Sequence, residues 1–171
     1  MADYEALGYD FLAITDHDDQ MREDRYWPAM RALRPARLLL FQGIEISYQP
    51  FAQHVGRVIG DHEVLHVLNH PARYRLDVEE ALERVGILRG DGLPIDAIEL
   101  TDTGRYKPVY DTDAIPLVKI ATDDAHFPRQ FGQAWIEVEA PARERDAILR
   151  SIKAGDFRVV FRQADLEARP S

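Results

Sequence analysis

Short apolar runs alternate along the chain with stretches whose apolar residues recur at helical spacing. Five of these runs lack strict apolar–polar alternation and are bounded by turn residues, at 10–15, 37–43, 64–69, 95–100 and 116–122. Runs of this kind are typical of strands that are buried on both faces of a parallel sheet. The pattern therefore predicts five such strands.

Three stretches between or after these runs predict helices, at residues 22–33, 78–86 and 143–155. Asp77 is a good N-cap for the second helix, and Gly86 and Gly155 are the expected helix stops. Residues 100–114 are polar and punctuated by proline and glycine, so we expect a long loop there. Alternating strands and helices indicate an α/β fold built from βαβ units with right-handed crossovers.

The composition is compatible with this α/β fold and limits the kinds of site and partner that the protein can have. The 171 residues suit one domain, spanning 1–171, with a sizeable core. The chain has no cysteine, which excludes disulfides and thiolate metal sites. No apolar stretch is long enough to cross a membrane, and we expect a cytoplasmic location and no signal peptide. The formal net charge of −9 argues against a nucleic-acid partner.

Ionisable residues fall at or just past the C-terminal end of each apolar run. They are Asp16, His17, Glu45, His70, Glu99, Asp123, Asp124 and His126. Taking one position per run (17, 45, 70, 99 and 124), the steps are 28, 25, 29 and 25 residues. A βα unit of a barrel uses about 30 residues, and its catalytic face lies at these strand ends. The spacing predicts that these side chains converge on one face.

Imidazole and carboxylate groups together suit a divalent ion such as Zn, Mn or Fe. The predicted metal ligands are His17, Glu45, His70, Asp124 and His126. Glu45, a carboxylate between apolar neighbours, is expected to act in catalysis by bridging two metals. Asp16 is expected to orient His17, to tune the attacking water or to cap the next helix.

Arg73 and Arg129 are candidates to bind a substrate phosphate, and His54 is a candidate to line the pocket. Each has a simpler reading, as a solvated arginine or a structural histidine. His66, inside an apolar run, is expected to pack in its strand, and Glu99 is open between a site residue and a strand-end carboxylate.

Four segments, in order, resemble motifs of the PHP family (polymerase and histidinol phosphatase domains). They read GYDFLAITDHD, GIEIS, LNHP and TDDAHF, and the stretch from FGQAWIEVEA to the helix ending in AG resembles the end of one PHP subgroup. The resemblance implies a distorted (β/α)7, TIM-like barrel that holds up to three divalent metals and hydrolyses phosphoesters. It implies that Glu45 bridges metals, that His70 and Asp124 each serve one metal, and that His17 and His126 serve another.

The chain departs from the family at its start. PHP domains open with a strand that carries an H-x-H motif, whereas this chain begins with MADYEALGYD. We therefore expect the first barrel strand to be missing and fewer metals to bind. Either the chain is part of a longer enzyme or it is a diverged remnant with a partial site. A second copy of the chain is one candidate for closing the open barrel edge.

Three functions remain open from the sequence. The first is a phosphoesterase that attacks a small-molecule phosphoester with metal-activated water. The second is hydrolysis of a carboxyl or carbamate ester at the same site, and the third is a non-catalytic metal-binding remnant. The substrate pocket is expected in loops such as 100–114, and the sequence of these loops does not distinguish the three functions.

Overall fold

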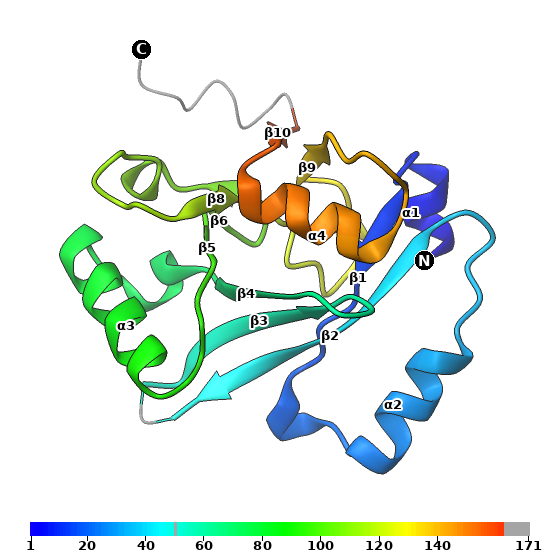
Figure 1. Cartoon of the computed structure of the whole chain (residues 1–171), viewed down its shortest axis with the longest axis horizontal. Helices are drawn as coiled ribbons and strands as arrows, with labels where there is room; N and C mark the ends of the chain where they lie inside the picture. Colours follow the sequence, from blue (N-terminus) through cyan, green and yellow to red (C-terminus); the bar gives the residue numbers. More distant parts are fainter. Residues whose placement is uncertain (50, 163–171) are drawn as a thin grey trace.

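The computed structural model describes residues 1–49 and 51–162, and its centre is a curled sheet (Figure 1). In this part of the chain the sheet has the order β1-β2-β3-β4-β5-β8. The strands are β1 (Phe11–Ala13), β2 (Leu39–Tyr48), β3 (Gln53–Ile59), β4 (Val64–Leu68), β5 (Ala97–Glu99) and β8 (Val118–Ile120). All pairs are parallel except those of β3, which runs antiparallel to both β2 and β4. The other five strands therefore point the same way.

Strand β3 corrects the expected run of βαβ units. The 25-residue step from Glu45 to His70 contains an antiparallel strand, whereas a run of βαβ units would connect the two flanking strands through a helix. The segment escaped prediction because its sequence, QHVGRVI, has neither a continuous apolar run nor a strict alternation of polar and apolar residues. Its Val55 is fully buried in the core, whereas its neighbour His54 points toward the strand-end cluster.

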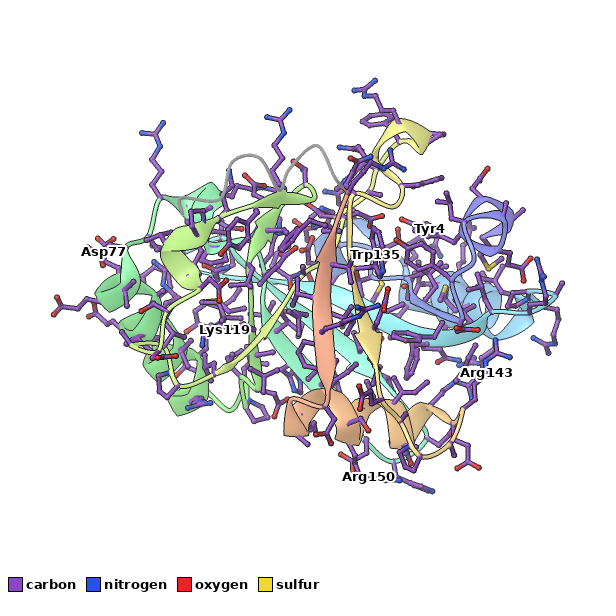
Figure 2. The ribbon with its side chains drawn as sticks, turned by 90° about the horizontal axis from the view of Figure 1, so that it is seen from above. Tyr4, Asp77, Lys119, Trp135, Arg143 and Arg150 are labelled. Carbon is purple, nitrogen blue, oxygen red and sulfur yellow. The ribbon has the colours of Figure 1, made fainter. Side chains whose placement is uncertain are left out.

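Two further ribbons lie outside the main sheet. Strands β9 (Ala134–Val138) and β10 (Phe157–Phe161) pair antiparallel and lie side by side in Figure 2. Residues 100–114, expected as a loop, contain a small hairpin of β6 (Thr101–Asp102) and β7 (Arg105–Tyr106). The hairpin is followed by a 3-10 turn, η3 (Pro108–Tyr110).

The described helices are α1 (Ala2–Ala6), α2 (Glu23–Ala32), α3 (Val78–Gly90) and α4 (Arg145–Ala154). Asp77 caps α3 as predicted, in a capping box with Glu80. The predicted stop at Gly86 is wrong, because α3 continues to Gly90. Helix α4 does end at Gly155, whose φ of 84° is the left-handed value that favours glycine. Short 3-10 turns complete the set, at Asp18–Gln20, Pro71–Tyr74 and Pro128–Gln130.

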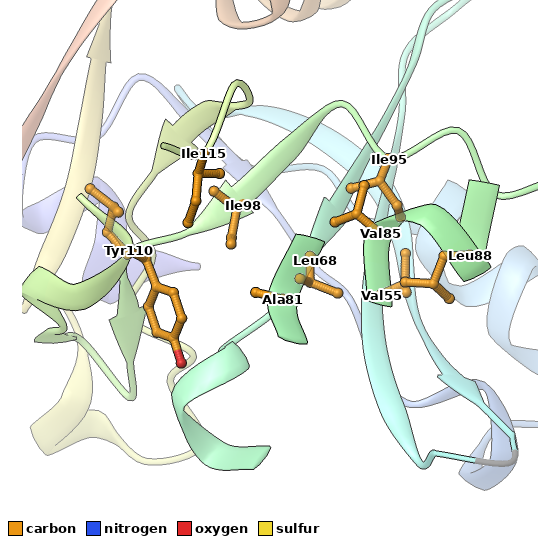
Figure 3. Packing of buried hydrophobic residues seen from close by; sticks show 10 residues of the cluster. Val55, Leu68, Ala81, Val85, Leu88, Ile95, Ile98, Tyr110 and Ile115 are labelled. Atoms are coloured by element: carbon orange, nitrogen blue, oxygen red, sulfur yellow. The ribbon is translucent and has the colours of Figure 1, made fainter. Parts of the chain in front are cut away.

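The sheet is covered on both faces by side chains that alternate along its strands. On one face, α3 packs Ala81, Val85 and Leu88 against strand residues such as Leu68 (Figure 3). On the other, α4 packs against residues such as Val67. Because neighbouring strand residues point to opposite faces, the second face also carries Glu45, Glu99 and the cleft described below.

The mixed α/β architecture agrees with the predicted class, and the curled sheet resembles half a barrel (Figure 1). The specific seven-stranded barrel lacking one strand stays a prediction. In the described residues, the outer strands β1 and β8 each pair on one side, with β2 and β5. None of the described helices is long and apolar enough to cross a membrane.

Candidate metal centre

A cleft of about 1750 Å³ extends along the second face of the sheet and reaches the C-terminal ends of the parallel strands. Its lining includes all eight strand-end residues that the sequence singled out, namely Asp16, His17, Glu45, His70, Glu99, Asp123, Asp124 and His126. The predicted convergence on one face therefore occurs. The contacts within the cluster decide what each side chain is able to do.

Glu45 lies at the centre of the cluster and is 5% exposed. It lies within β2, three residues before the strand ends, and faces Gly56 of β3. Its Oε2 lies 3.2 Å from Nδ1 of His17 and 3.3 Å from Nδ1 of His54. Its Oε1 accepts a 2.7 Å hydrogen bond from the side-chain amide of Asn69. A carboxylate this deeply buried is stable only because both oxygens have polar partners.

Gly56 provides the space for this arrangement. A Cβ atom added at position 56 would lie 2.8 Å from Oδ1 of Asn69, closer than real Cβ contacts allow. A glycine is therefore needed where β3 passes beneath the Asn69 side chain. Because Asn69 is the donor to Glu45, the glycine indirectly sets the orientation of that carboxylate.

His17, Glu45 and His54 form a group that could hold a metal ion, with one donor atom from each within 4.8 Å of the others. Burial is the main influence on His54 and lowers its pKa, although the neighbouring Glu45 carboxylate opposes the effect. A lowered pKa keeps the imidazole neutral, which is the form that binds metals. Two imidazoles and one buried carboxylate match the donor types of divalent-metal sites, so the residues present fit such an ion.

His70 lies against this group but is held differently. The residue is 1% exposed and adopts a φ of 28°, a strained value for a non-glycine residue. Its Nε2 is 3.1 Å from Nδ1 of His54 and 3.8 Å from Oε1 of Glu45. Its buried Nδ1 has no hydrogen-bond partner among the described residues. The imidazole therefore lies against the cluster, with Nε2 on the side of His54 and Glu45 and with Nδ1 3.5 Å from Oε2 of Glu99.

Glu99 fixes the backbone of that turn. Its carboxylate accepts 2.7 Å hydrogen bonds from the hydroxyl groups of Thr101 and Thr122 and from the backbone N–H of His70. These donors occupy both oxygens, and the residue is 1% exposed. The geometry favours the strand-end reading of Glu99, with a role in positioning His70.

Asp124 and His126 lie at the mouth of the cluster. Asp124 has a φ of 42°, and its Oδ2 accepts a 2.6 Å hydrogen bond from Arg73. The His126 side chain is 51% exposed, and its ring centre lies 6.4 Å from that of His17. Asp124 is thus paired with a cation of the protein, and His126 is at the solvent edge.

Two of the remaining predicted site residues, Asp16 and Arg73, lie at the site, and Arg129 contacts an exposed ring. Asp16 lines the cleft, and its backbone carbonyl accepts a hydrogen bond from the backbone N–H of Glu45, which joins the ends of β1 and β2. Arg73 lies in the cluster, beside His70 and Asp124. The guanidinium group of Arg129 lies 5.1 Å from the centre of the exposed Phe127 ring.

Asn69 and Tyr74 were missed from the sequence, and His54 was placed only as a pocket-lining residue. Asn69 donates to Glu45, and the Tyr74 hydroxyl accepts the backbone N–H of His54. The position of Asn69 at the end of an apolar run was the available signal. It lies two residues after Val67, so the two side chains point to the same face of the sheet. Recognising His54 required the strand β3, which the pattern did not reveal.

Comparisons with known proteins concern the fold of the chain and one of its segments. A family model described as PHP-associated matches residues 117–157, which include Asp124 and His126. A crystal structure of a two-domain protein from Bacteroides vulgatus ATCC 8482, containing a predicted PHP-like metal-dependent phosphoesterase, superposes with a TM-score of 0.67 at 18% identity. The match covers 90% of this chain and 56% of that one. No curated protein matches the sequence. The resemblance to the PHP family is therefore confirmed.

Proposed function

We propose that this PHP-like chain is a metal-dependent hydrolase whose substrate is a small-molecule phosphoester. The observation that carries the proposal is the environment of Glu45, a buried carboxylate with two imidazoles on one oxygen and an amide donor on the other. Burying such a group is costly unless it serves a bound ligand or a tight polar network. A divalent ion at His17, Glu45 and His54 accounts for both the donor types and their convergence.

A bound divalent ion supplies Lewis acidity, which polarises a phosphoryl oxygen and lowers the pKa of a coordinated water. The chain's own residues provide the rest. Asn69 holds Glu45 in one orientation, and burial keeps His54 neutral. Asp16 and His126 lie at the cleft wall and its exposed edge, where they are proposed to orient the attacking water and to exchange protons with the departing group.

The substrate is expected to enter from the side of His126 and Arg73, the exposed part of the cluster. A guanidinium group can hold two phosphate oxygens at once, whereas it has no comparable partner on a neutral ester. This favours a phosphoester over a carboxyl or carbamate ester. The zinc, manganese or iron preference is open, because each accepts imidazole and carboxylate donors.

The direct test is hydrolysis of an aryl phosphate and of the matching aryl carboxylic ester by chain loaded with Mn²⁺ or Zn²⁺. The proposal expects phosphate turnover, lost on chelation and reduced at least 100-fold by Glu45→Gln. The matched control is Glu79→Gln, which changes an exposed acid in the first turn of α3 and is expected to leave turnover unchanged. Turnover that survives Glu45→Gln would contradict the site, and turnover of the carboxylic ester alone would replace the substrate class.

A further inference from the structure

The Arg73 guanidinium lies where the side chains of Asp102, Asp124 and His70 converge. Its Nη2 donates to Oδ2 of Asp124 at 2.6 Å and to Oδ1 of Asp102 at 3.0 Å. Its Nη1 lies 3.3 Å from Nε2 of His70. Two carboxylates and one imidazole thus face a single positive charge. Such a set of donors is also the one that a divalent cation takes in proteins.

The local fold holds Arg73 at this place. The residue is in the short 3-10 turn Pro71–Tyr74, and its backbone N–H donates to the carbonyl oxygen of His70 at 2.9 Å. The turn lies between two non-glycine residues with positive φ, His70 at 28° and Arg75 at 57°. Strain of this kind persists where the surrounding structure fixes the backbone. The arginine is therefore directed back across the strand ends toward Asp102 and Asp124.

We propose that Arg73 is a built-in cation that takes the place of a second divalent ion, so that the site binds one ion per chain. This inference rests on the proposed function, because it assumes the ion at His17, Glu45 and His54. It assigns the site two positive centres of different kinds. One is an exchangeable metal, and the other is a guanidinium group that belongs to the chain.

The orientation of Glu45 supports a single ion. A carboxylate that bridges two metals presents one oxygen to each, but here Oε2 faces His17 and His54 while Oε1 accepts the amide of Asn69. The oxygen nearer to His70, at 3.8 Å, is the one bonded to Asn69. Glu45 is thus arranged to serve one cation.

The charge balance points the same way. The Arg73 guanidinium forms ion pairs with both Asp124 and Asp102. A guanidinium group stays charged at every pH at which proteins are folded. A divalent ion entering between the two carboxylates would meet this fixed positive charge and would have to displace a 2.6 Å ion pair.

The test is the number of Mn²⁺ ions bound per chain, measured by equilibrium dialysis and elemental analysis. Wild type is expected to bind one ion, and Arg73→Gln is expected to bind two, because it frees Asp102, Asp124 and His70. Arg73→Lys keeps a positive charge and should stay at one. The matched control is Arg150→Gln, which removes an exposed arginine that pairs with Glu63 on α4's side of the molecule. It should also stay at one.

The outcomes separate the inference from the proposed function. Two or more ions on wild type, or one ion on a folded Arg73→Gln variant, would overturn the inference while leaving the metal site in place. No ion on wild type would overturn both. Circular dichroism of each variant establishes that it is folded. If Arg73→Gln does not fold, Arg73→Met takes its place, and one ion on that folded variant would overturn the inference in the same way.

Discussion

At the scale of single residues, Glu45 owes its position to side chains from distant parts of the sequence. His17 follows β1, His54 belongs to β3, and Asn69 follows β4. No neighbour along β2 contributes a polar partner of this kind. The polar network therefore depends on the register of the sheet, and removing Asn69 would leave Oε1 of Glu45 without its hydrogen-bond donor.

Asn69 offers the cleanest residue-scale prediction. Replacing Asn69 with Ala removes the 2.7 Å hydrogen bond to Oε1 of Glu45. An unsatisfied buried acceptor costs about 1–3 kcal/mol, so the metal-free protein should lose about that much stability. Urea denaturation with chelator present measures the loss. An unchanged free energy of unfolding would show that the amide does not support the carboxylate.

His66 gives a pH prediction at a site away from the cluster. The residue is 8% exposed, burial followed by the charge of Arg57 lowers its pKa, and its Nδ1 has no hydrogen-bond partner in the described residues. The unfolded chain then binds more protons than the folded one below about pH 6.5, so stability is lost as the pH falls. Urea denaturation between pH 7.5 and 5 should show a steeper loss for wild type than for His66→Leu. Parallel curves would contradict the prediction.

The strand-end residues were predictable because a sheet repeats its geometry at every parallel strand. Asp16, His17, Glu45, His70 and Asp124 each follow or end an apolar run, and the structure brings them to one cleft. Their roles as metal ligands stay predictions. The sequence did not reveal which of them pair with each other, because such pairs depend on side-chain contacts between strands. Arg73 with Asp124 is the clearest example.

At the scale of elements, strand β3 is the strand of the main sheet that sequence patterning missed. Five strands and three helices were predicted near their observed positions, since buried strands and amphipathic helices leave distinct periodicities. A strand with one face in the core and one face toward a polar site has a weaker signature. Missing β3 also hid His54, the third member of the metal group.

Alanine substitutions at two glycines are expected to change the free energy of unfolding in opposite directions. Gly56→Ala would place a Cβ 2.8 Å from Asn69, so it should destabilise the protein by about 1–3 kcal/mol through overpacking. Gly86→Ala lies inside α3 with no heavy atom within 4 Å of the new Cβ, so it should stabilise by about 0.5–1 kcal/mol.

Chemical denaturation of the two variants beside wild type gives both values. A stabilising Gly56→Ala would show that β3 and Asn69 are not in the contact described. A strongly destabilising Gly86→Ala would show that α3 ends before residue 90.

At the scale of the whole molecule, the curled sheet explains why one face carries the chemistry. Helix α3 covers the face that carries Val55, Leu68 and Ile98, and α4 with β9 and β10 covers part of the other. The cleft lies on this second face at the strand ends. That a second copy pairs with the sheet edge stays a prediction, as does the single-domain assignment of residues 1–171.

The net charge of the chain limits where a phosphate group can bind. A chain of net charge −9 disfavours phosphate binding over most of its surface. Substrate binding therefore has to rely on local positive charge, which the account places at the bound ion and at Arg73. Together these two positive charges would neutralise part of the negative charge of Glu45, Asp102 and Asp124.

The central claim is that His17, Glu45 and His54 hold a divalent ion, and anomalous scattering from crystals grown with Zn²⁺ tests it most directly. The account predicts that the strongest anomalous peak lies about 2.0–2.2 Å from a nitrogen of His17, a nitrogen of His54 and an oxygen of Glu45. A strongest peak elsewhere on the chain, or no peak in this cleft with zinc in excess, would contradict it.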